Sequence, residues 1–158
     1  MLWRSKVLLE QGDFQAVSAW LESLLPLLQR GPSLQSEEVQ MVQARFYQLQ
    51  GKHSQALALL EPVVLGAEAS GRYGNLIPLL LLQAISLDAQ GQSEAALERV
   101  GKCLRLAQPE RYLMKFRDEG PQVEKLIRTL RARELAQPIQ AYADEILQIF
   151  TARSALAA

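Results

Sequence analysis

The chain has 158 residues, of which 49% are hydrophobic and 6% aromatic, and its 17 Lys and Arg balance its 17 Asp and Glu. The hydrophobic fraction excludes a disordered chain and predicts a packed core, while the zero net charge argues against a polybasic binder of nucleic acid or membrane surfaces. One cysteine, Cys103, and one histidine, His53, exclude an intrachain disulfide and are too few for a structural zinc site.

Apolar residues recur along the chain at three- and four-residue steps, which is the period of an α-helix. The pattern is clear from Val17 through Leu21 to Leu28. Glycines separate stretches rich in Leu, Ala, Gln and Glu, which favour helix, and strict alternation is missing. The sequence therefore predicts an all-α fold. The expected helices cover residues 1–11, 13–29, 35–50, 53–70, 74–90, 93–107, 120–134 and 138–152.

Several ends of these helices carry a sequence signal. Asp13 and Ser93 are expected to cap the helices that begin there, and Ser36 stands near the start of the third helix. Pro121 and Pro138 fit first turns, where a missing N–H costs nothing. Three further prolines either kink a helix or mark an end that lies a few residues away: Pro26, Pro62 and Pro78.

The glycines also mark a repeat, since Gly12, Gly51 and Gly91 are 39 and 40 residues apart. Aligning the chain on them superposes small residues, which let two helices approach closely, and larger apolar residues, which fill the groove between the helices. The pattern predicts helix pairs that stack as a solenoid. The aligned positions are Ser5, Ala44 and Ala84; Leu8, Tyr47 and Leu87; Val17, Ala56 and Ala96; and Leu21, Leu60 and Val100.

This pattern resembles tetratricopeptide repeats, with a longer spacing than their usual length of about 34 residues. The runs at 51–61, 67–72, 77–84 and 91–97, followed by Phe116-Arg117-Asp118-Glu119-Gly120-Pro121, are similar to a more specific family. That family is the tetratricopeptide-like sensor region of the large ATP-dependent LuxR-type transcription regulators of the maltose-regulator type. The segment from Tyr142 to Phe150 resembles the helix that leads into the family's helix-turn-helix domain.

The resemblance implies a right-handed superhelix of about three helix pairs over residues 1–110 and a C-terminal two-helix extension over 111–152. Residues 153–158 are then a tail or linker toward a helix-turn-helix domain that this chain lacks, so DNA contact would come only through that domain. The family's ATPase module is absent because no Gly-rich phosphate-binding loop with Lys-Ser/Thr occurs. The implied role is sensing a small-molecule inducer or a regulatory protein. The alternative is a free-standing protein-interaction adaptor, which docks on a partner or on itself.

The concave surface of such superhelices is lined by the first helix of each pair. By register, the resemblance assigns this surface to Lys6, Glu10, Glu38, Met41, Arg45, Gln48, Leu81, Ile85 and Asp88. Arg45 and Asp88 would hold a polar ligand or a peptide's carboxylate and amine, while Leu81 and Ile85 would supply apolar contact. The alternative is that these residues are solvated charges and buried solenoid core.

Charge is unevenly distributed along the chain. Residues 99–133 carry a net charge of +6, against −4 for residues 1–98 and −2 for 134–158. This basic segment either helps to hold phosphates beside a DNA-binding domain or is a charged face toward neighbouring domains. No aromatic interleaving or recognition helix accompanies it, which favours the second interpretation.

No residue set predicts catalysis, so we expect neither an enzyme nor a metal or cofactor site. Asp118 and Glu119 are adjacent and fit a helix N-terminus better than a catalytic dyad. His53 fits a turn or cap and Cys103 a small buried hydrophobe. Two tryptophans, Trp3 and Trp20, are expected in the core.

The sequence predicts a cytoplasmic protein without a membrane partner, and the family resemblance implies a bacterial source. Its longest apolar run, residues 76–82, is shorter than the ~20 residues of a membrane span. The first residues show no signal-peptide pattern.

Overall fold

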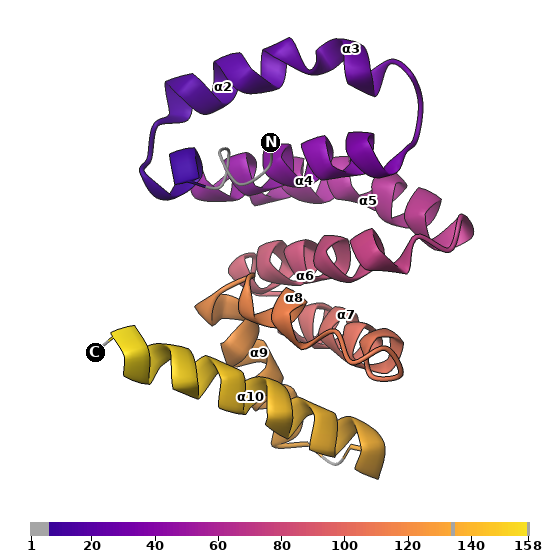
Figure 1. Cartoon of the computed structure of the whole chain (residues 1–158), viewed down its shortest axis with the longest axis vertical. Coiled ribbons are helices and arrows are strands. Elements are labelled where there is room, and N and C mark those ends of the chain that lie inside the picture. Colours follow the sequence, from indigo (N-terminus) through magenta and orange to yellow (C-terminus); the bar gives the residue numbers. More distant parts are fainter. Residues whose placement is uncertain (1–6, 134, 158) are drawn as a thin grey trace. The chain divides into compact units, whose positions relative to one another are not determined.

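The computed structural model describes residues 7–133 and 135–157, in which every long regular element is a helix (Figure 1). Residues 7–10 are helical. They are followed by α2 (Phe14–Ser23), α3 (Leu25–Leu28), α4 (Leu34–Leu49), α5 (His53–Ala69), α6 (Tyr73–Ala89), α7 (Ser93–Ala107), α8 (Leu113–Arg117), α9 (Pro121–Arg131) and α10 (Gln137–Ala157). The all-α prediction is therefore confirmed.

One turn recurs at the glycines of the repeat. In the turn at Gly91, the Gly91 N–H donates to the Asp88 carbonyl at 3.0 Å and the Gln92 N–H donates to the Leu87 carbonyl at 2.9 Å. Gly91 has φ +79°, a left-handed conformation that closes a helix end at no steric cost when no side chain is present. The same two bonds and positive φ occur at Gly12 and Gly51, so the sequence repeat is a repeat of helix-ending turns.

The small residues of the repeat are packing positions. Ala44 and Ala84 on the first helices, and Ala56 and Ala96 on the second helices, have no exposed surface. Ser5, the first expected member of the set, lies outside the described residues. A methyl group at these sites lets neighbouring helices pack closely, which confirms the predicted helix-pair packing.

The chain forms two compact units, residues 1–79 and 80–158, and the boundary between them falls within α6. In the first unit α4 packs along α5, while α2 and α3 pack on α4. Leu9, Val17 and Val42 form a small core there. Trp20 packs against this core, as expected, whereas Trp3 lies outside the described residues.

Of three predicted helix caps, one is confirmed, one lies three residues earlier than expected, and one is wrong. The Asp13 carboxylate accepts the Ala16 N–H at 3.0 Å and caps α2. At α4, Ser33 and Ser36 cap each other's backbone N–H in a capping box, so the cap precedes Ser36 by three residues. Ser93 is not a cap, because it is the first residue of α7 and its hydroxyl bonds instead to Asp88 at 3.4 Å.

The prolines divide into those that start helices and those inside them. The single helix expected over 13–29 is wrong, because α2 ends at Ser23 and Pro26 lies in the first turn of α3. A proline cannot donate the N–H that a continuous helix requires there. Pro62 and Pro78 lie inside α5 and α6, which continue past them. Pro121 begins α9, as predicted.

In the second unit α7 packs on α9, and α10 contacts α7, α8 and α9. The short helix α8 was not predicted, since five residues are too few to show a helical period. It is anchored by Phe116, which is fully buried and meets Tyr142 edge-on with ring centroids 6.1 Å apart. Helix α10 runs to Ala157, beyond the expected end at residue 152.

None of the helices in the described part of the chain combines the length and the apolar character that a bilayer crossing requires.

Candidate functional site

Helix α4 carries the first set of predicted groove residues. Met41, Arg45 and Gln48 are spaced by four and three positions, so they share one face of α4. Met41 is buried, whereas Arg45 and Gln48 are half-buried, as is Glu38 one turn earlier. Glu10 is exposed at the end of the helical residues 7–10. Polar side chains and a packed methionine thus share this face of α4.

Helix α6 carries the second set with the same spacing. Leu81 has no exposed surface and belongs to the core, while Ile85 and Asp88 are half-buried. The Asp88 carboxylate already accepts from Lys125 at 3.3 Å. A cationic ligand group at Asp88 must therefore compete with Lys125.

The candidates fall into separate units, since the α4 set belongs to residues 1–79 and the α6 set to residues 80–158. Lys6 lies outside the described residues. A single groove that includes both sets stays a prediction.

Each unit also contains a pocket that sequence reasoning missed. The pocket of the first unit has a volume of about 220 Å³ and lies where α4 and α5 meet the segment after α3. Its wall contains a buried carboxylate, Glu37, whose side chain is 2% exposed. It is lined by Leu28, Gly31, Pro32, Ser36, Glu37, Gln40, Pro62, Val63, Gly66 and Arg72.

Glu37 is held by residues from the start of α6. Arg72 donates from Nε to Glu37 Oε1 at 2.6 Å, and Asn75 donates from Nδ2 to Glu37 Oε2 at 3.1 Å. The Nη2 atom of Arg72 also forms an ion pair with this carboxylate but has no hydrogen-bond partner among the described residues. The network compensates a buried charge and fixes the ends of α4 and α6 to each other.

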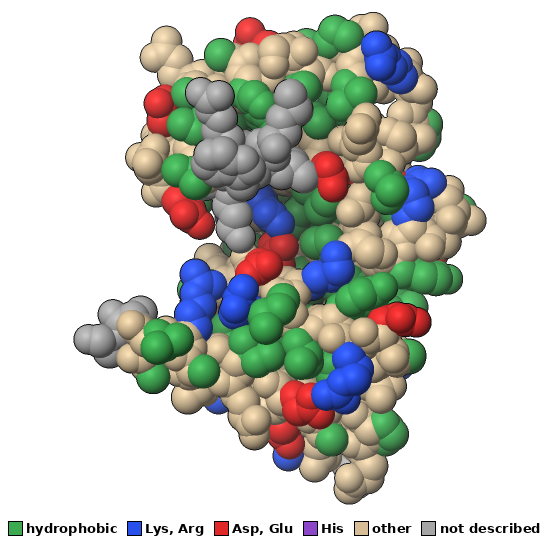
Figure 2. All heavy atoms as spheres, viewed as in Figure 1, with side chains coloured by type: hydrophobic (Ala, Val, Ile, Leu, Met, Phe, Trp, Pro, Cys, Tyr) green, Lys and Arg blue, Asp and Glu red, His purple; other side chains and the backbone are tan. Residues whose placement is uncertain are grey.

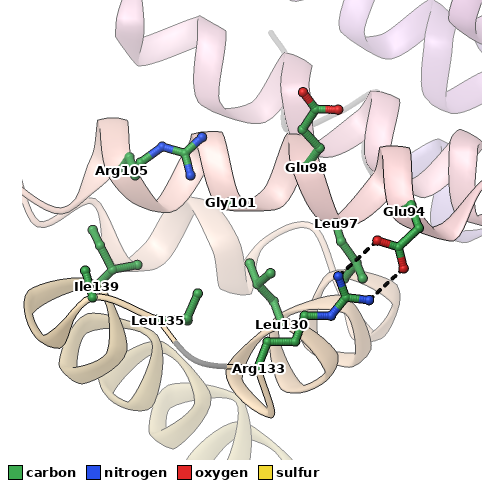
Figure 3. Close-up of a pocket in the computed structure, with 10 residues that line it drawn as sticks. Glu94, Leu97, Glu98, Gly101, Arg105, Leu130, Arg133, Leu135 and Ile139 are labelled. Carbon is green, nitrogen blue, oxygen red and sulfur yellow. Dashed lines mark hydrogen bonds and ion pairs between the residues drawn. The ribbon is translucent and has the colours of Figure 1, made fainter.

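The pocket of the second unit has a volume of about 300 Å³ and lies between one face of α7 and the α9–α10 connection (Figure 3). Arg133 closes one end by donating to both carboxylate oxygens of Glu94, at 2.6 and 3.0 Å. This bidentate pair lowers the pKa of Glu94 and raises the pKa of Arg133. The lining residues are Glu94, Leu97, Glu98, Gly101, Arg105, Leu130, Arg133, Leu135, Ala136 and Ile139.

The basic segment 99–133 is largely paired within its own unit. Its cations meet carboxylates from the acidic segments on either side, which disperses the +6 charge. On the face shown in Figure 2, Lys and Arg side chains lie beside Asp and Glu rather than in one basic field. This supports the interpretation of a packed, charged face. The pairs across segments are Lys125–Asp88, Arg133–Glu94, Arg131–Asp144 and Arg111–Glu145.

The remaining chemically active side chains have structural positions. Cys103 is fully buried and burial raises the pKa of its thiol, which opposes the thiolate that a nucleophile needs. His53 begins α5, and Asp118 and Glu119 precede Gly120 at the start of α9, as expected. Among the described residues, no three His, Cys, Asp or Glu lie close enough to hold a metal ion.

Repeated helix-ending turns, buried small residues at fixed register and sequential helix packing define a tetratricopeptide-like region. The family model described as the MalT-like TPR region matches residues 2–133, so the chain belongs to this family. The resemblance stated from the sequence is thereby confirmed, and α10 lies beyond the matched residues. No curated protein and no solved structure matches the chain.

Proposed function

We propose that the chain is the effector-sensing region of a LuxR-type transcription regulator, which binds a small-molecule inducer or a regulatory protein on the half-buried faces of its first helices. The observation that carries the proposal is the match of residues 2–133 to a region found in regulators of the MalT and LuxR type. In this proposal residues 1–110 supply the repeats and 111–152 the extension. Residues 153–158 lead toward a DNA-binding domain outside this chain.

The chemistry of α4 and α6 supports this role. Arg45 and Gln48 on α4, with Ile85 and Asp88 on α6, combine hydrogen-bonding groups with apolar contact, all on half-buried positions. Such positions are accessible to a ligand and are still held by the packed helix beneath them. An effector shifts a regulator between states only through the difference in its affinity for the two states.

The test is thermal unfolding of the chain with a set of sugars, nucleotides and carboxylic acids. A compound at 100 times its Kd stabilises the folded state by about 2.7 kcal/mol, which for a chain of this size raises Tm by about 5–10 °C. We expect Arg45→Ala and Asp88→Ala to weaken binding of the active compound. The matched control is Glu22→Ala, on an exposed site of α2. Unchanged affinity in both variants would remove the groove from the proposal.

The alternative function is a protein-interaction adaptor, which the tetratricopeptide-like fold favours because stacked helix pairs form extended binding surfaces. A regulator that senses a protein and a free-standing adaptor both predict a stoichiometric protein complex. They differ in the small-molecule screen, where only a sensor of an inducer gives a shift in Tm. Self-association is measured separately, by sedimentation over a range of concentrations.

A further inference from the structure

Arg105 lines the pocket of the second unit, and its guanidinium has no hydrogen-bond or ion-pair partner among the described residues. The residue is exposed on α7. The other cation that lines the pocket, Arg133, is bound to both carboxylate oxygens of Glu94. The carboxylate of Glu98 is directed away from the apolar wall of the pocket in Figure 3. The charge that the pocket offers to a ligand is therefore the cation of Arg105.

Gly101 determines where this guanidinium lies. A side chain on an α-helix leans toward the helix N-terminus and covers the turn before its own Cα, which for Arg105 is the turn of Gly101. Arg105 Nη1 accordingly lies 3.4 Å from the point that a Cβ of Gly101 would occupy. Figure 3 shows the guanidinium extending along α7 toward Gly101. Because glycine has no side chain, the cation can rest against the helix within the α7 wall of the pocket.

The apolar wall of the pocket begins at the same point. Arg105 Nη1 and Leu130 Cδ2 lie 3.4 and 3.7 Å from the Cβ position of Gly101, so these two atoms are no more than 7.1 Å apart. Leu135 and Ile139 extend the wall from the α9–α10 connection and the start of α10 (Figure 3). A cation at the edge of an apolar surface fits an anion that carries an apolar chain.

A carboxylate group matches these distances. A carboxylate oxygen accepts from a guanidinium at about 2.7–2.9 Å, and apolar carbon atoms are in contact within about 4 Å. Together the two lengths cover the separation between Arg105 Nη1 and Leu130 Cδ2, so one small ligand can make both contacts. The pocket volume of about 300 Å³ is at the lower end of the range for small-ligand sites, which favours a small free acid over a peptide.

We propose that the pocket of the second unit binds a small aliphatic monocarboxylate, with its carboxylate on Arg105 and its chain on Leu130, Leu135 and Ile139. The site lies within residues 80–158, and none of its lining residues belongs to the α4 and α6 faces of the proposed function. A peptide's carboxyl terminus offers the same head group, so the test includes both sources of the carboxylate.

The first experiment records methyl NMR spectra of the full chain, labelled at the isoleucine δ1 methyls, during a titration with hexanoate. Ile139 is expected to shift with a Kd in the millimolar range, as for a ligand of this size, while Ile85 on α6 stays unchanged. Hexanamide, which keeps the chain but lacks the charge, should bind about tenfold more weakly. Butanoate should also bind more weakly, because each buried methylene strengthens binding about fourfold. Equal binding of hexanoate and hexanamide, or a titration that leaves Ile139 unshifted, would overturn the proposal.

Two charge variants on α7 identify the cation that binds the carboxylate. In Arg105→Gln, hexanoate and hexanamide should bind equally, since the polar side chain is kept and its charge is removed. The matched control Lys102→Gln removes the same charge one turn away, from a residue that does not line the pocket, and should keep the tenfold preference for hexanoate. Loss of the preference in both variants alike would mean a general attraction by the basic segment and would contradict a carboxylate site at Arg105.

Variants of Gly101 and a blocked peptide complete the test. Gly101→Leu places a side chain between Arg105 and Leu130 and should abolish hexanoate binding, whereas Gly101→Ala adds a methyl at ordinary contact distances and should keep the fold with weakened binding. Native affinity in Gly101→Leu would contradict the proposal. So would binding of acetyl-alanyl-leucine, whose single charge is its carboxylate, that is much tighter than binding of hexanoate, because the ligand would then be a peptide's carboxyl terminus.

Discussion

Arg72 donates from Nε to Oε1 of Glu37 at 2.6 Å, while the Glu37 side chain is only 2% exposed. A buried carboxylate that loses its cation leaves an uncompensated charge, which is far more costly than the pair itself is favourable. The Arg72–Glu37 pair is therefore required for the polar contact between the first turns of α4 and α6 to be stable.

We predict that Arg72→Ala lowers the free energy of unfolding by about 3 kcal/mol, because Asn75 alone cannot compensate the Glu37 charge. The double variant Glu37→Leu/Arg72→Met removes both charges and should lie within about 1 kcal/mol of the native chain. Urea unfolding at pH 7 measures both. A double variant as unstable as Arg72→Ala would mean that the loss arises from packing and not from the buried charge.

The turn before α8 offers a second prediction. Arg111 has φ +53° and stands where Gly51, Gly71 and Gly91 stand in the earlier turns, with the next N–H bonded to a carbonyl five residues back in each case. A side chain in this conformation costs about 1–2 kcal/mol. We predict that Arg111→Gly is about 1 kcal/mol more stable than Arg111→Ala, since both lose the Glu145 ion pair.

The converse change is Gly91→Ala. An added Cβ at Gly91 meets nothing within 4 Å, so its cost is purely that of the backbone conformation. We expect a loss of about 1 kcal/mol in thermal unfolding. If Gly91→Ala is neutral while Arg111→Gly stabilises, the shared turn geometry is not the source of either effect.

Tyr142 has a fully buried side chain whose hydroxyl has no hydrogen-bond partner among the described residues. Because a buried unpaired hydroxyl is unfavourable, Tyr142→Phe should raise the stability by about 1 kcal/mol and keep the contact with Phe116. Urea unfolding at pH 7 tests this. Destabilisation by Tyr142→Phe would show that the hydroxyl is satisfied in solution.

Burial also raises the pKa of Tyr142 to about 12. A folded-state pKa above the unfolded value of about 10 gives a stabilising contribution that is complete below pH 10 and is lost as the pH rises from 10 to 12. The native chain should therefore lose more stability over that range than Tyr142→Phe does. Equal losses would contradict the raised pKa.

The Glu94–Arg133 pair predicts a pH effect of opposite sign. Since Arg133 lowers the pKa of Glu94, the contribution of the pair is present above the unfolded pKa and is lost as the pH falls through the folded value. Carbon-detected NMR titration should find the Glu94 pKa below its ordinary value in the native chain. In Arg133→Gln it should return toward that value, and the shift should shrink in high salt.

The helices and the family were predictable from the sequence because they depend on local and periodic signals. The spacing of Gly12, Gly51 and Gly91 indicates a repeated turn that needs a residue with positive φ, which glycine adopts without strain. Alanines at fixed positions of the repeat indicate close helix packing. Helix α8 was missed because it is too short to have a period. The interruption at Leu24 was missed because Pro26 equally fits a kink.

The two pockets could not be predicted, since each depends on residues that are distant in sequence. The burial of Glu37 follows only from its contact with Arg72, 35 residues later. Similarly, the sequence around Gly101 does not show that Leu130 and Arg105 lie close to it. The sequence did indicate the basic segment, but only the structure pairs it with the flanking carboxylates.

The proposed function requires an effector to bind the half-buried faces of α4 and α6. Hydrogen–deuterium exchange of the chain, with and without the compound that raises Tm most, tests it directly. We expect slowed exchange at the amides around Arg45 and Asp88, and loss of that protection in Arg45→Ala and Asp88→Ala. Protection confined to other helices, or none at a saturating concentration, would contradict the claim.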